Sequence, residues 1–149
     1  MKIFVAADHR GFETKNDIIA YLKDRGYDVE DDSAKSLNPD DDFPVFAGRA
    51  VHKVLSSEDD DARAILICGT GQGMIMAANR FRGIRAGFGW SRQAAKVMRN
   101  DEDANIIAIS AEMYQHDQVL IENIIEDFLT TPFAAAPRFI RRNAELDSL

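Results

Sequence analysis

The sequence predicts an α/β fold in which helices cover both faces of one parallel sheet. Two observations lead to this prediction. Short apolar runs alternate with amphipathic helical segments along the 149 residues, and such alternation is typical of a parallel sheet with crossover helices. In addition, the run 64–67 has four consecutive apolar residues, which suits a strand that is covered on both faces.

The first part of the chain contains three predicted strands. Strands appear as short apolar runs, whereas helices have apolar residues every three or four positions. Glycine is favoured directly after a helix, and proline in its first turn. In order, the elements are a strand over 2–6, a helix over 14–25 that Gly26 ends, a strand over 27–31, a polar loop over 33–42, a helix from Pro44 to about residue 55, and a strand over 64–68.

The second part of the chain continues the alternation. Ser91 and Asp117 suit helix N-caps, because their side-chain oxygens accept hydrogen bonds from backbone N–H groups of the first turn. In order, the elements are a helix over 73–81, a strand over 84–88, a helix from Ser91 to 99, a strand over 105–110, a helix from Asp117 to about residue 129, and a basic tail whose start is bracketed by Pro132 and Pro137.

These elements predict a single-domain, Rossmann-like three-layer sandwich with a five-stranded parallel sheet in the order 2-1-3-4-5. The domain covers residues 1–149, and its C-terminal tail covers 132–149. Ligands of open parallel sheets bind beyond the carboxyl ends of the strands, where the winding direction reverses. In this order the first and third strands are neighbours, so we expect the loop 7–11 to face the loop 68–73.

Composition argues against several classes of protein. The formal net charge of −7 disfavours nonspecific attraction to nucleic acid or to an anionic membrane. A single cysteine cannot form an internal disulfide and fits a reducing compartment. Because a strand pattern begins at Lys2 and no apolar run approaches membrane-spanning length, we expect neither a signal peptide nor a membrane anchor. We therefore expect a cytoplasmic protein.

A glycine-spaced loop follows the third predicted strand. The spacing Gly69-x-Gly71-x-Gly73 differs from the dinucleotide fingerprint, which needs its third glycine at Met74, and the loop lacks the Lys-Ser/Thr pair of a P-loop. Backbone N–H groups at a strand-to-helix turn can nevertheless hold a phosphate or a developing oxyanion. The alternative is that the glycines serve only a tight turn.

Cys68 stands where this strand meets the loop. A cysteine on a buried strand is usually a small apolar filler. At the carboxyl end of a strand, beside a helix N-terminus, a thiolate is stabilised and can act as a nucleophile or a base. His9 is the one histidine placed to serve it across the gap between the first and third strands. Asp8 and His9 together suit an acid/base or hydroxyl-binding pair.

Six short motifs occur in order along nearly the whole chain. They are Asp8-His9-x-Gly11, Asp42-x-Pro44, Cys68-Gly69-Thr70-Gly71-x-Gly73, Ala77-Ala78-Asn79, Gly83-Ile84-Arg85-Ala86 and Asp103-x-Asn105. Together they resemble the ribose-5-phosphate isomerase B family, which includes galactose-6-phosphate isomerase subunits. The resemblance implies an aldose–ketose isomerase for a phosphorylated sugar that uses neither a metal nor an organic cofactor. It also implies a homodimer or a dimer of dimers with active sites at the subunit interface.

The same resemblance implies a role for individual residues. Cys68 looks like the base that removes the proton α to the carbonyl and returns it to the neighbouring carbon. Thr70 resembles the residue that moves a proton between the two sugar oxygens. The implied substrate-binding groups are the amides of Gly69, Gly71 and Gly73 for the enediolate, Asp8 for sugar hydroxyls, His9, Arg138 and Arg142 for phosphate, and Asn79.

Two arginines of the tail suit phosphate on physical grounds as well. Arg138 and Arg142 are four residues apart, so on a helix they would share one face, which suits one dianionic ligand. The alternative is that Arg138, Arg141 and Arg142 form a solvated or salt-bridging tail in an acidic protein.

The chain departs from the family pattern at several positions. Phe43 stands where a tyrosine is common, Glu112 where an arginine is common, and Phe139 where a histidine is common. Asp101-Glu102-Asp103 replaces a common His-Asn-Asp sequence, whose histidine is associated with opening of the furanose ring.

Three explanations for the missing histidine stay open. The chain can act on ribose 5-phosphate, with Asp101 or Glu102 as the replacement acid/base, and this is the hypothesis that we favour. It can act on another sugar phosphate, either a hexose 6-phosphate or a tetrose 4-phosphate, which cannot close a furanose ring. It can also be a weak or inactive relative that binds phosphosugars. A non-enzymatic phosphate-binding module is an alternative of a different class, because a fold alone does not determine function.

Overall fold

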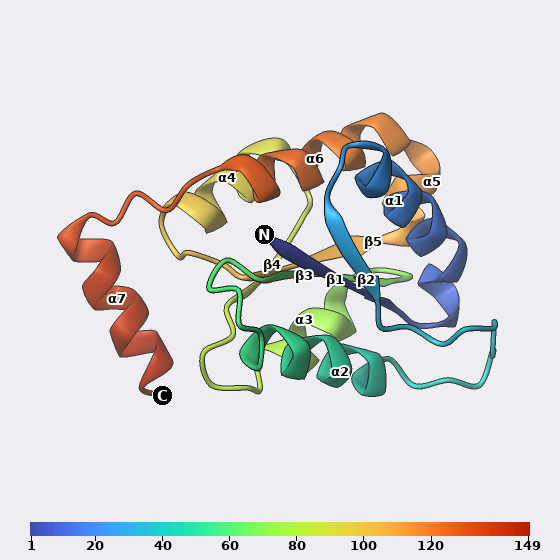
Figure 1. Cartoon of the computed structure of the whole chain (residues 1–149), viewed down its shortest axis with the longest axis horizontal. Helices are drawn as coiled ribbons and strands as arrows, with labels where there is room; N and C mark the ends of the chain where they lie inside the picture. Colours follow the sequence, from blue (N-terminus) through green and yellow to red (C-terminus); the bar gives the residue numbers. More distant parts are fainter.

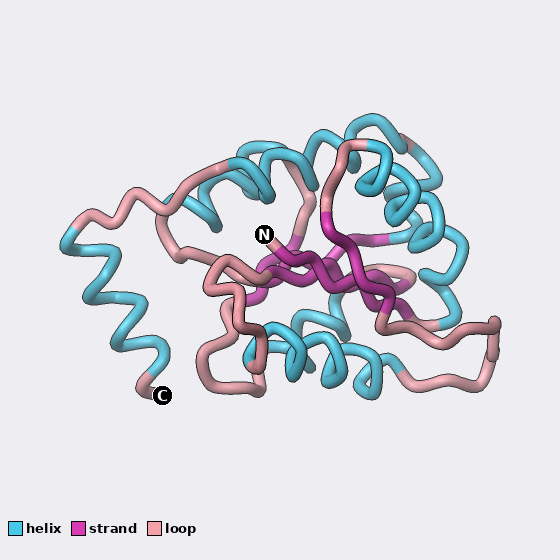
Figure 2. The backbone as a smooth tube through the Cα atoms, in the orientation of Figure 1, coloured by secondary structure: helices cyan, strands magenta, loops and turns pink.

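A parallel sheet of five strands forms the middle layer of the computed structural model, which describes residues 1–149 (Figures 1 and 2). All neighbouring strands pair in parallel, and their order is β2-β1-β3-β5-β4. The strands are β1 (Lys2–Ala7), β2 (Asp28–Asp31), β3 (Arg63–Cys68), β4 (Ala86–Phe88) and β5 (Ile106–Ser110). The predicted fold class is therefore confirmed.

The order of the last two strands differs from the prediction. β5 pairs with β3 in the interior of the sheet, whereas β4 lies at the edge. The five residues of β5 are all buried, while the three residues of β4 are only partly buried and include Gly87. An edge position suits β4, because a short strand with a glycine has little side-chain surface to bury.

Helices cover both faces of the sheet (Figure 1). On one face lie α1 (Phe12–Asp24), α4 (Arg92–Asn100), α5 (Ala111–His116) and α6 (Gln118–Thr130), and on the other lie α2 (Phe43–Leu55) and α3 (Gln72–Ala78). Ser91 and Asp117 cap α4 and α6 as predicted, since their side chains accept from the N–H groups of Ala94 and Leu120. The short α5 and the 3₁₀ turn η1 (His9–Gly11) were not predicted. None of the helices has the length and apolar character needed to cross a membrane.

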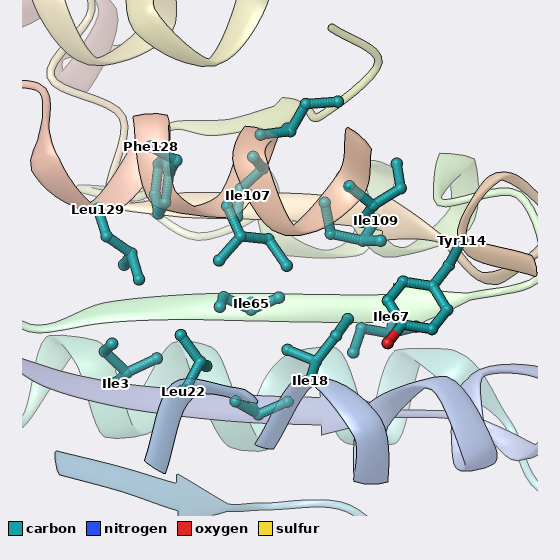
Figure 3. Close-up of a cluster of buried hydrophobic side chains, with 14 of the residues drawn as sticks. Ile3, Ile18, Leu22, Ile65, Ile67, Ile107, Ile109, Tyr114, Phe128 and Leu129 are labelled. Carbon is teal, nitrogen blue, oxygen red and sulfur yellow. The ribbon is translucent and has the colours of Figure 1, made fainter. Parts of the chain in front are cut away.

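Two apolar cores flank the sheet, and alternate residues of β3 contribute to each. Ile65 and Ile67 point toward α1 and α6, where they pack with Phe128 and other fully buried side chains (Figure 3). Leu66 and Cys68 belong to the opposite core, under α2 and α3. This alternation follows from the two-residue repeat of a strand. It places the thiol on the α2 and α3 side of the sheet.

The C-terminal tail forms a helix, α7 (Pro137–Asp147), which stands apart from the other layers (Figure 1). It lies at the amino end of the strands, where the Arg85 guanidinium pairs with Asp147 at 2.8 Å. The Asn143 amide also donates to the carbonyl of Asp101 at 3.4 Å. A cleft of about 790 Å³ lies beside these contacts, lined by parts of the 79–87 segment and by the last residues of the chain.

Candidate active site

Two loops meet at the carboxyl ends of β1 and β3. The strands are in register with Ala7 opposite Ile67, so the loop that begins at Asp8 lies against the start of the glycine loop, as predicted. Gly11 permits this approach, because a Cβ at that position would come 2.6 Å from the carbonyl oxygen of Ile67. The chemistry-bearing residues 8, 9 and 68–73 therefore lie together.

The thiol of Cys68 lies at the base of this junction. The residue is 6% exposed, and the N–H of Gly71 donates to its sulfur at 3.1 Å. Gly71 has a φ of +80°, a conformation that favours glycine. The Ser110 hydroxyl donates to the carbonyl of Gly69 at 2.8 Å, which fixes the start of the loop. The glycine loop thus holds a backbone donor on the sulfur atom.

The open side of the loop carries Thr70 and Phe43. Thr70 is exposed, and its hydroxyl makes no hydrogen bond within the chain, so it is available to a ligand. The Phe43 ring lies over Gly73, where a Cβ would come 2.9 Å from ring carbons. The aromatic side chain therefore forms one wall beside the first turn of α3, and glycine leaves the space for it.

Asp8 is a buried carboxylate whose Oδ1 caps η1. That oxygen accepts from the N–H groups of Arg10 at 3.0 Å and Gly11 at 3.1 Å. Burial raises the pKa of Asp8, which the two N–H donors partly oppose. No hydrogen bond uses Oδ2, so this oxygen is free to accept from a sugar hydroxyl.

His9 is paired with Asp41, a residue that the sequence did not single out. Nδ1 of His9 lies 2.8 Å from Oδ1 of Asp41, and the same oxygen accepts from the His9 backbone N–H at 2.9 Å. The hydrogen bond to Asp41 is the main reason that the pKa of His9 is raised. A histidine that holds its proton to higher pH suits an anionic ligand. The only sequence signal for Asp41 is its place in the acidic loop before Pro44.

The remaining predicted site residues lie at the other end of the sheet. Asp101 directly follows α4, ahead of β5, whereas Cys68 pairs with the last residue of β5. The five residues of β5 span about 17 Å at about 3.3 Å per residue. Glu102 follows Asp101, and α7 lies at the same amino edge, where its Asn143 contacts Asp101. Within one chain, these groups therefore cannot contact a ligand that is bound at Cys68.

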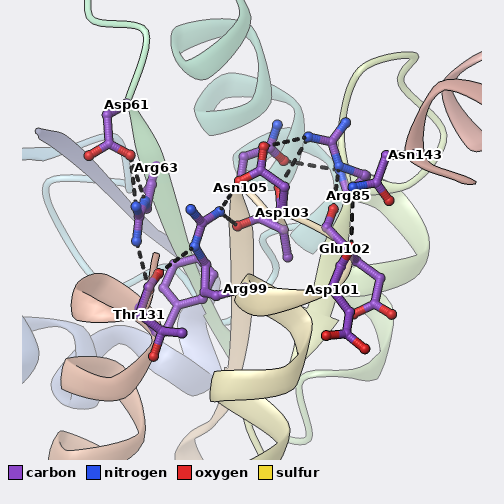
Figure 4. Close-up of polar contacts among 12 residues, drawn as sticks. Asp61, Arg63, Arg85, Arg99, Asp101, Glu102, Asp103, Asn105, Thr131 and Asn143 are labelled. Atoms are coloured by element: carbon purple, nitrogen blue, oxygen red, sulfur yellow. Dashed lines mark hydrogen bonds and ion pairs between the residues drawn. The ribbon is translucent and has the colours of Figure 1, made fainter. Parts of the chain in front are cut away.

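Arginine side chains hold the backbone around Asp101 and Glu102 (Figure 4). Arg85 donates from Nε to the carbonyl of Glu102 at 2.7 Å, and Arg99 pairs with Asp103 at 2.8 Å. No other residue of the chain forms a hydrogen bond with the Glu102 carboxylate. Burial, with a further contribution from the charge of Asp101, raises the pKa of Glu102. The loop thus presents a carboxylate that takes up a proton more readily than usual.

Arg138 and Arg142 lie in the first half of α7, four residues apart, and therefore share one face as predicted. Both are exposed, and neither forms a salt bridge within the chain, whereas Arg141 pairs with Glu145 at 3.7 Å. The alternative of a salt-bridging tail therefore applies only to Arg141.

Asn79 lies at the far end of α3 from the glycine loop. Its amide exchanges two hydrogen bonds with the backbone of Ala86, donating at 2.9 Å and accepting at 2.8 Å. Asn105 does the same with the segment before β4, accepting from the N–H of Arg85 and donating to the carbonyl of Gly83. Both asparagines thus have a structural role, and a contact of Asn79 with substrate stays a prediction.

The fold and the motifs of this chain match those of a known protein family. Residues 3–146 match the family model described as Ribose/Galactose Isomerase. The chain belongs to this family. The resemblance that the motifs carry is therefore confirmed, and the protein is an aldose–ketose isomerase.

Individual members of the isomerase family show how far the likeness extends. Ribose-5-phosphate isomerase B of Mycolicibacterium paratuberculosis is 36% identical over 142 residues, which cover 95% of this chain and 87% of that protein. A 4-deoxy-4-sulfo-D-erythrose isomerase of Clostridium sp. is 38% identical over 135 residues, covering 89% and 81%. The crystal structure of Mycoplasma genitalium ribose-5-phosphate isomerase B with bound ribulose-5-phosphate matches with a TM-score of 0.88 and 32% identity, covering 99% and 94%.

Proposed function

We propose that this isomerase interconverts ribose 5-phosphate and ribulose 5-phosphate through an enediolate, with Cys68 as the base. The observation that carries the proposal is the position of the Cys68 sulfur, which accepts an N–H bond from Gly71 beside the Asp8 and His9 loop. Ribose-5-phosphate isomerase B relatives and a relative that holds ribulose-5-phosphate support the choice of pentose phosphate.

The reaction needs a base, an oxyanion site and a proton carrier. In the open-chain aldose, the Cys68 thiolate takes the C2 proton, and the electron pair moves through the C1–C2 bond onto O1. Backbone N–H groups of the glycine loop stabilise this oxyanion. Thr70 transfers the proton of O2 to O1, and the Cys68 thiol returns its proton to C1, which completes the ketose. No atom or electron is gained or lost.

A second copy of the chain completes the proposed site. Arg138 and Arg142 face solvent without carboxylate partners, and they lie at the opposite edge of the sheet from His9. On the same helix, Ile140 is 52% exposed, an apolar side chain that a neighbouring subunit would cover. We infer a homodimer or a dimer of dimers, in which α7 of one copy brings both arginines to the phosphate beside His9 of the other.

Mixing two inactive variants tests this arrangement. Cys68→Ala removes the base, and the double variant Arg138→Ala/Arg142→Ala removes the tail arginines. After equal amounts are mixed and reassociate, about half of the dimers contain one copy of each variant. If the site is shared, one of the two sites in each mixed dimer is intact, so we expect about a quarter of wild-type activity. Each variant alone serves as the control. If the mixture stays as inactive as its components while mixed dimers form, the site lies within one chain.

Ring opening requires an acid/base, which we assign to Glu102 or Asp101 of the second copy. The raised pKa of Glu102 suits proton exchange closer to neutral pH. We expect Glu102→Gln to slow turnover of ribose 5-phosphate but to leave turnover of a four-carbon aldose phosphate unchanged, because that sugar cannot close a furanose ring. Equal losses on both sugars would contradict a role in ring opening.

Two observations favour a second candidate substrate, a four-carbon aldose with an anionic group at C4. The chain has carboxylates at the ring-opening position, and one relative is named an isomerase of 4-deoxy-4-sulfo-D-erythrose. Measuring kcat/KM for ribose 5-phosphate, erythrose 4-phosphate, galactose 6-phosphate and 4-deoxy-4-sulfo-erythrose decides between the substrates. Our proposal requires ribose 5-phosphate to have the highest value. A phosphate-binding module without activity would bind these sugars and convert none of them.

A further inference from the structure

Arg10 is a cation at the mouth of the site that the reaction as proposed does not use. It belongs to η1, directly after His9, and its guanidinium lies against the glycine loop. A Cβ built on Gly69 would come 2.7 Å from Nη1 of Arg10. The side chain therefore occupies space that only a glycine at position 69 leaves open.

Glu112 holds this guanidinium in place. Its Oε1 lies 2.5 Å from Nη2 of Arg10, although the two residues are 102 positions apart in the sequence. The backbone N–H of Glu112 also donates to the carbonyl of Gly69 at 3.2 Å. Arg10, Gly69 and Glu112 thus form one cluster at the carboxyl end of the sheet.

The Arg10 side chain keeps donors for a ligand. Only Nη2 is used within the chain, so the N–H groups on Nε and Nη1 are free. Arg10 is 54% and Glu112 55% exposed, and an exposed ion pair of this kind contributes little to folding. The neighbouring His9 has a raised pKa because of Asp41. The free Arg10 donors therefore lie against Gly69, in the same loop segment as His9.

We propose that Arg10 binds the tetrahedral anionic group of the substrate. In this proposal Glu112 is the positioning residue: it orients the guanidinium, and its negative charge disfavours anions of higher charge. This inference rests on the proposed function, because it adds a residue that binds the anionic group of the substrate, next to His9 and the α7 arginines of a second copy. The Glu112 carboxylate repels a phosphate dianion more strongly than a sulfonate monoanion, since Coulomb energy scales with ligand charge. The pair thereby influences which anionic group the site prefers.

Equilibrium binding of inorganic phosphate, measured by calorimetry, tests the proposal without turnover. We expect Arg10→Ala to weaken phosphate binding about tenfold, as expected for loss of one charge-assisted hydrogen bond. Its KM for the sugar phosphate should rise by a similar factor, with kcat within about twofold. Arg25→Ala is the matched control, because this exposed arginine ends α1 at the opposite edge of the sheet. It should leave phosphate binding unchanged.

Glu112→Gln provides an independent arm. Glutamine still accepts a hydrogen bond from Arg10 but carries no charge, so phosphate should bind about threefold more tightly and methanesulfonate by a smaller factor. If neither Arg10→Ala nor Glu112→Gln changes phosphate affinity beyond twofold, the proposal is wrong even if the enzyme turns over ribose 5-phosphate. If phosphate affinity responds as expected but no pentose phosphate is converted, the proposed substrate fails and the anion site stands. Circular dichroism of each variant checks folding. Should Arg10→Ala fail to fold, the result for Glu112→Gln decides the test.

Discussion

Gly71→Ala changes a residue that determines the conformation of the glycine loop and donates a hydrogen bond to the Cys68 sulfur. Gly71 has a φ of +80°, and placing alanine there costs about 1–2 kcal/mol. Its Cβ would also come 2.7 Å from the Phe88 ring, and such overpacking costs about 1–3 kcal/mol. The total expected loss of unfolding free energy is about 2–5 kcal/mol, or a fall in Tm of about 4–20 °C for a chain of this length.

Gly26→Ala is the matched control for this prediction. Gly26 has nearly the same φ, +81°, but a Cβ there would have no neighbour within 4 Å. It should therefore lose only the conformational part, about 1–2 kcal/mol. Urea denaturation of both variants measures the difference, and the double variant Gly71→Ala/Phe88→Ala should lose less stability than the sum of the two single variants. Equal destabilisation of the two glycine variants would refute the assigned contact with Phe88.

Two further substitutions test the contacts around the site. Asp41→Asn should lower the pKa of His9, since the hydrogen bond to Asp41 is the main reason that this pKa is raised. Because the protonated ring favours phosphate binding, the variant should lose phosphate binding at a lower pH than the wild type. A pH series of phosphate affinity measures this, with Asp42→Asn, whose side chain makes no cap hydrogen bond, as the control. Asn79→Ala leaves Ala86 without two backbone partners and should cost about 1–3 kcal/mol of unfolding free energy. Asn123→Ala, which loses one bond within its own helix where Asn79 loses two bonds to another element, should cost less than about 0.5 kcal/mol, and equal losses would contradict the structural role of Asn79.

The pH dependence of stability has the same origin. Because the pKa of His9 is raised in the folded protein, its protonation stabilises the fold fully below its unfolded pKa of about 6.5. This contribution is lost as the pH rises through the folded pKa. Asp41→Asn should therefore flatten the loss of stability that the wild type shows as the pH rises from about 6.5 through the folded pKa of His9.

Local sequence patterns were sufficient for the five strands, for the longer helices and for the position of the glycine loop, but not for α5 and η1. The caps at Ser91 and Asp117 depend on hydrogen bonds to the first turn of the helix, and the glycine-spaced turn that leads into α3 consists of consecutive residues. Such features involve neighbours in the chain, so the sequence displays them directly. The same holds for the shared helical face of Arg138 and Arg142.

Strand order and the pairing of distant side chains required the tertiary structure. Crossover connections allow β5 to lie on either side of β4, and the relative burial of the two strands decides between the orders. The pairs His9–Asp41 and Arg10–Glu112 join residues from separate loops, and nothing in the local sequence marks their contact.

The sequence by itself determined the α/β class, the place of Cys68 at a strand end and the family motifs, because each of these depends on residues that are close together in the chain. Only the tertiary structure decided that the thiol and the carboxylates of residues 101 and 102 lie at opposite ends of the sheet. The physical reason is that the strands of a parallel sheet all end at the same edge, so the loops after the strands lie together there. A helix that returns the chain to the other edge carries the residues at its end about 17 Å away.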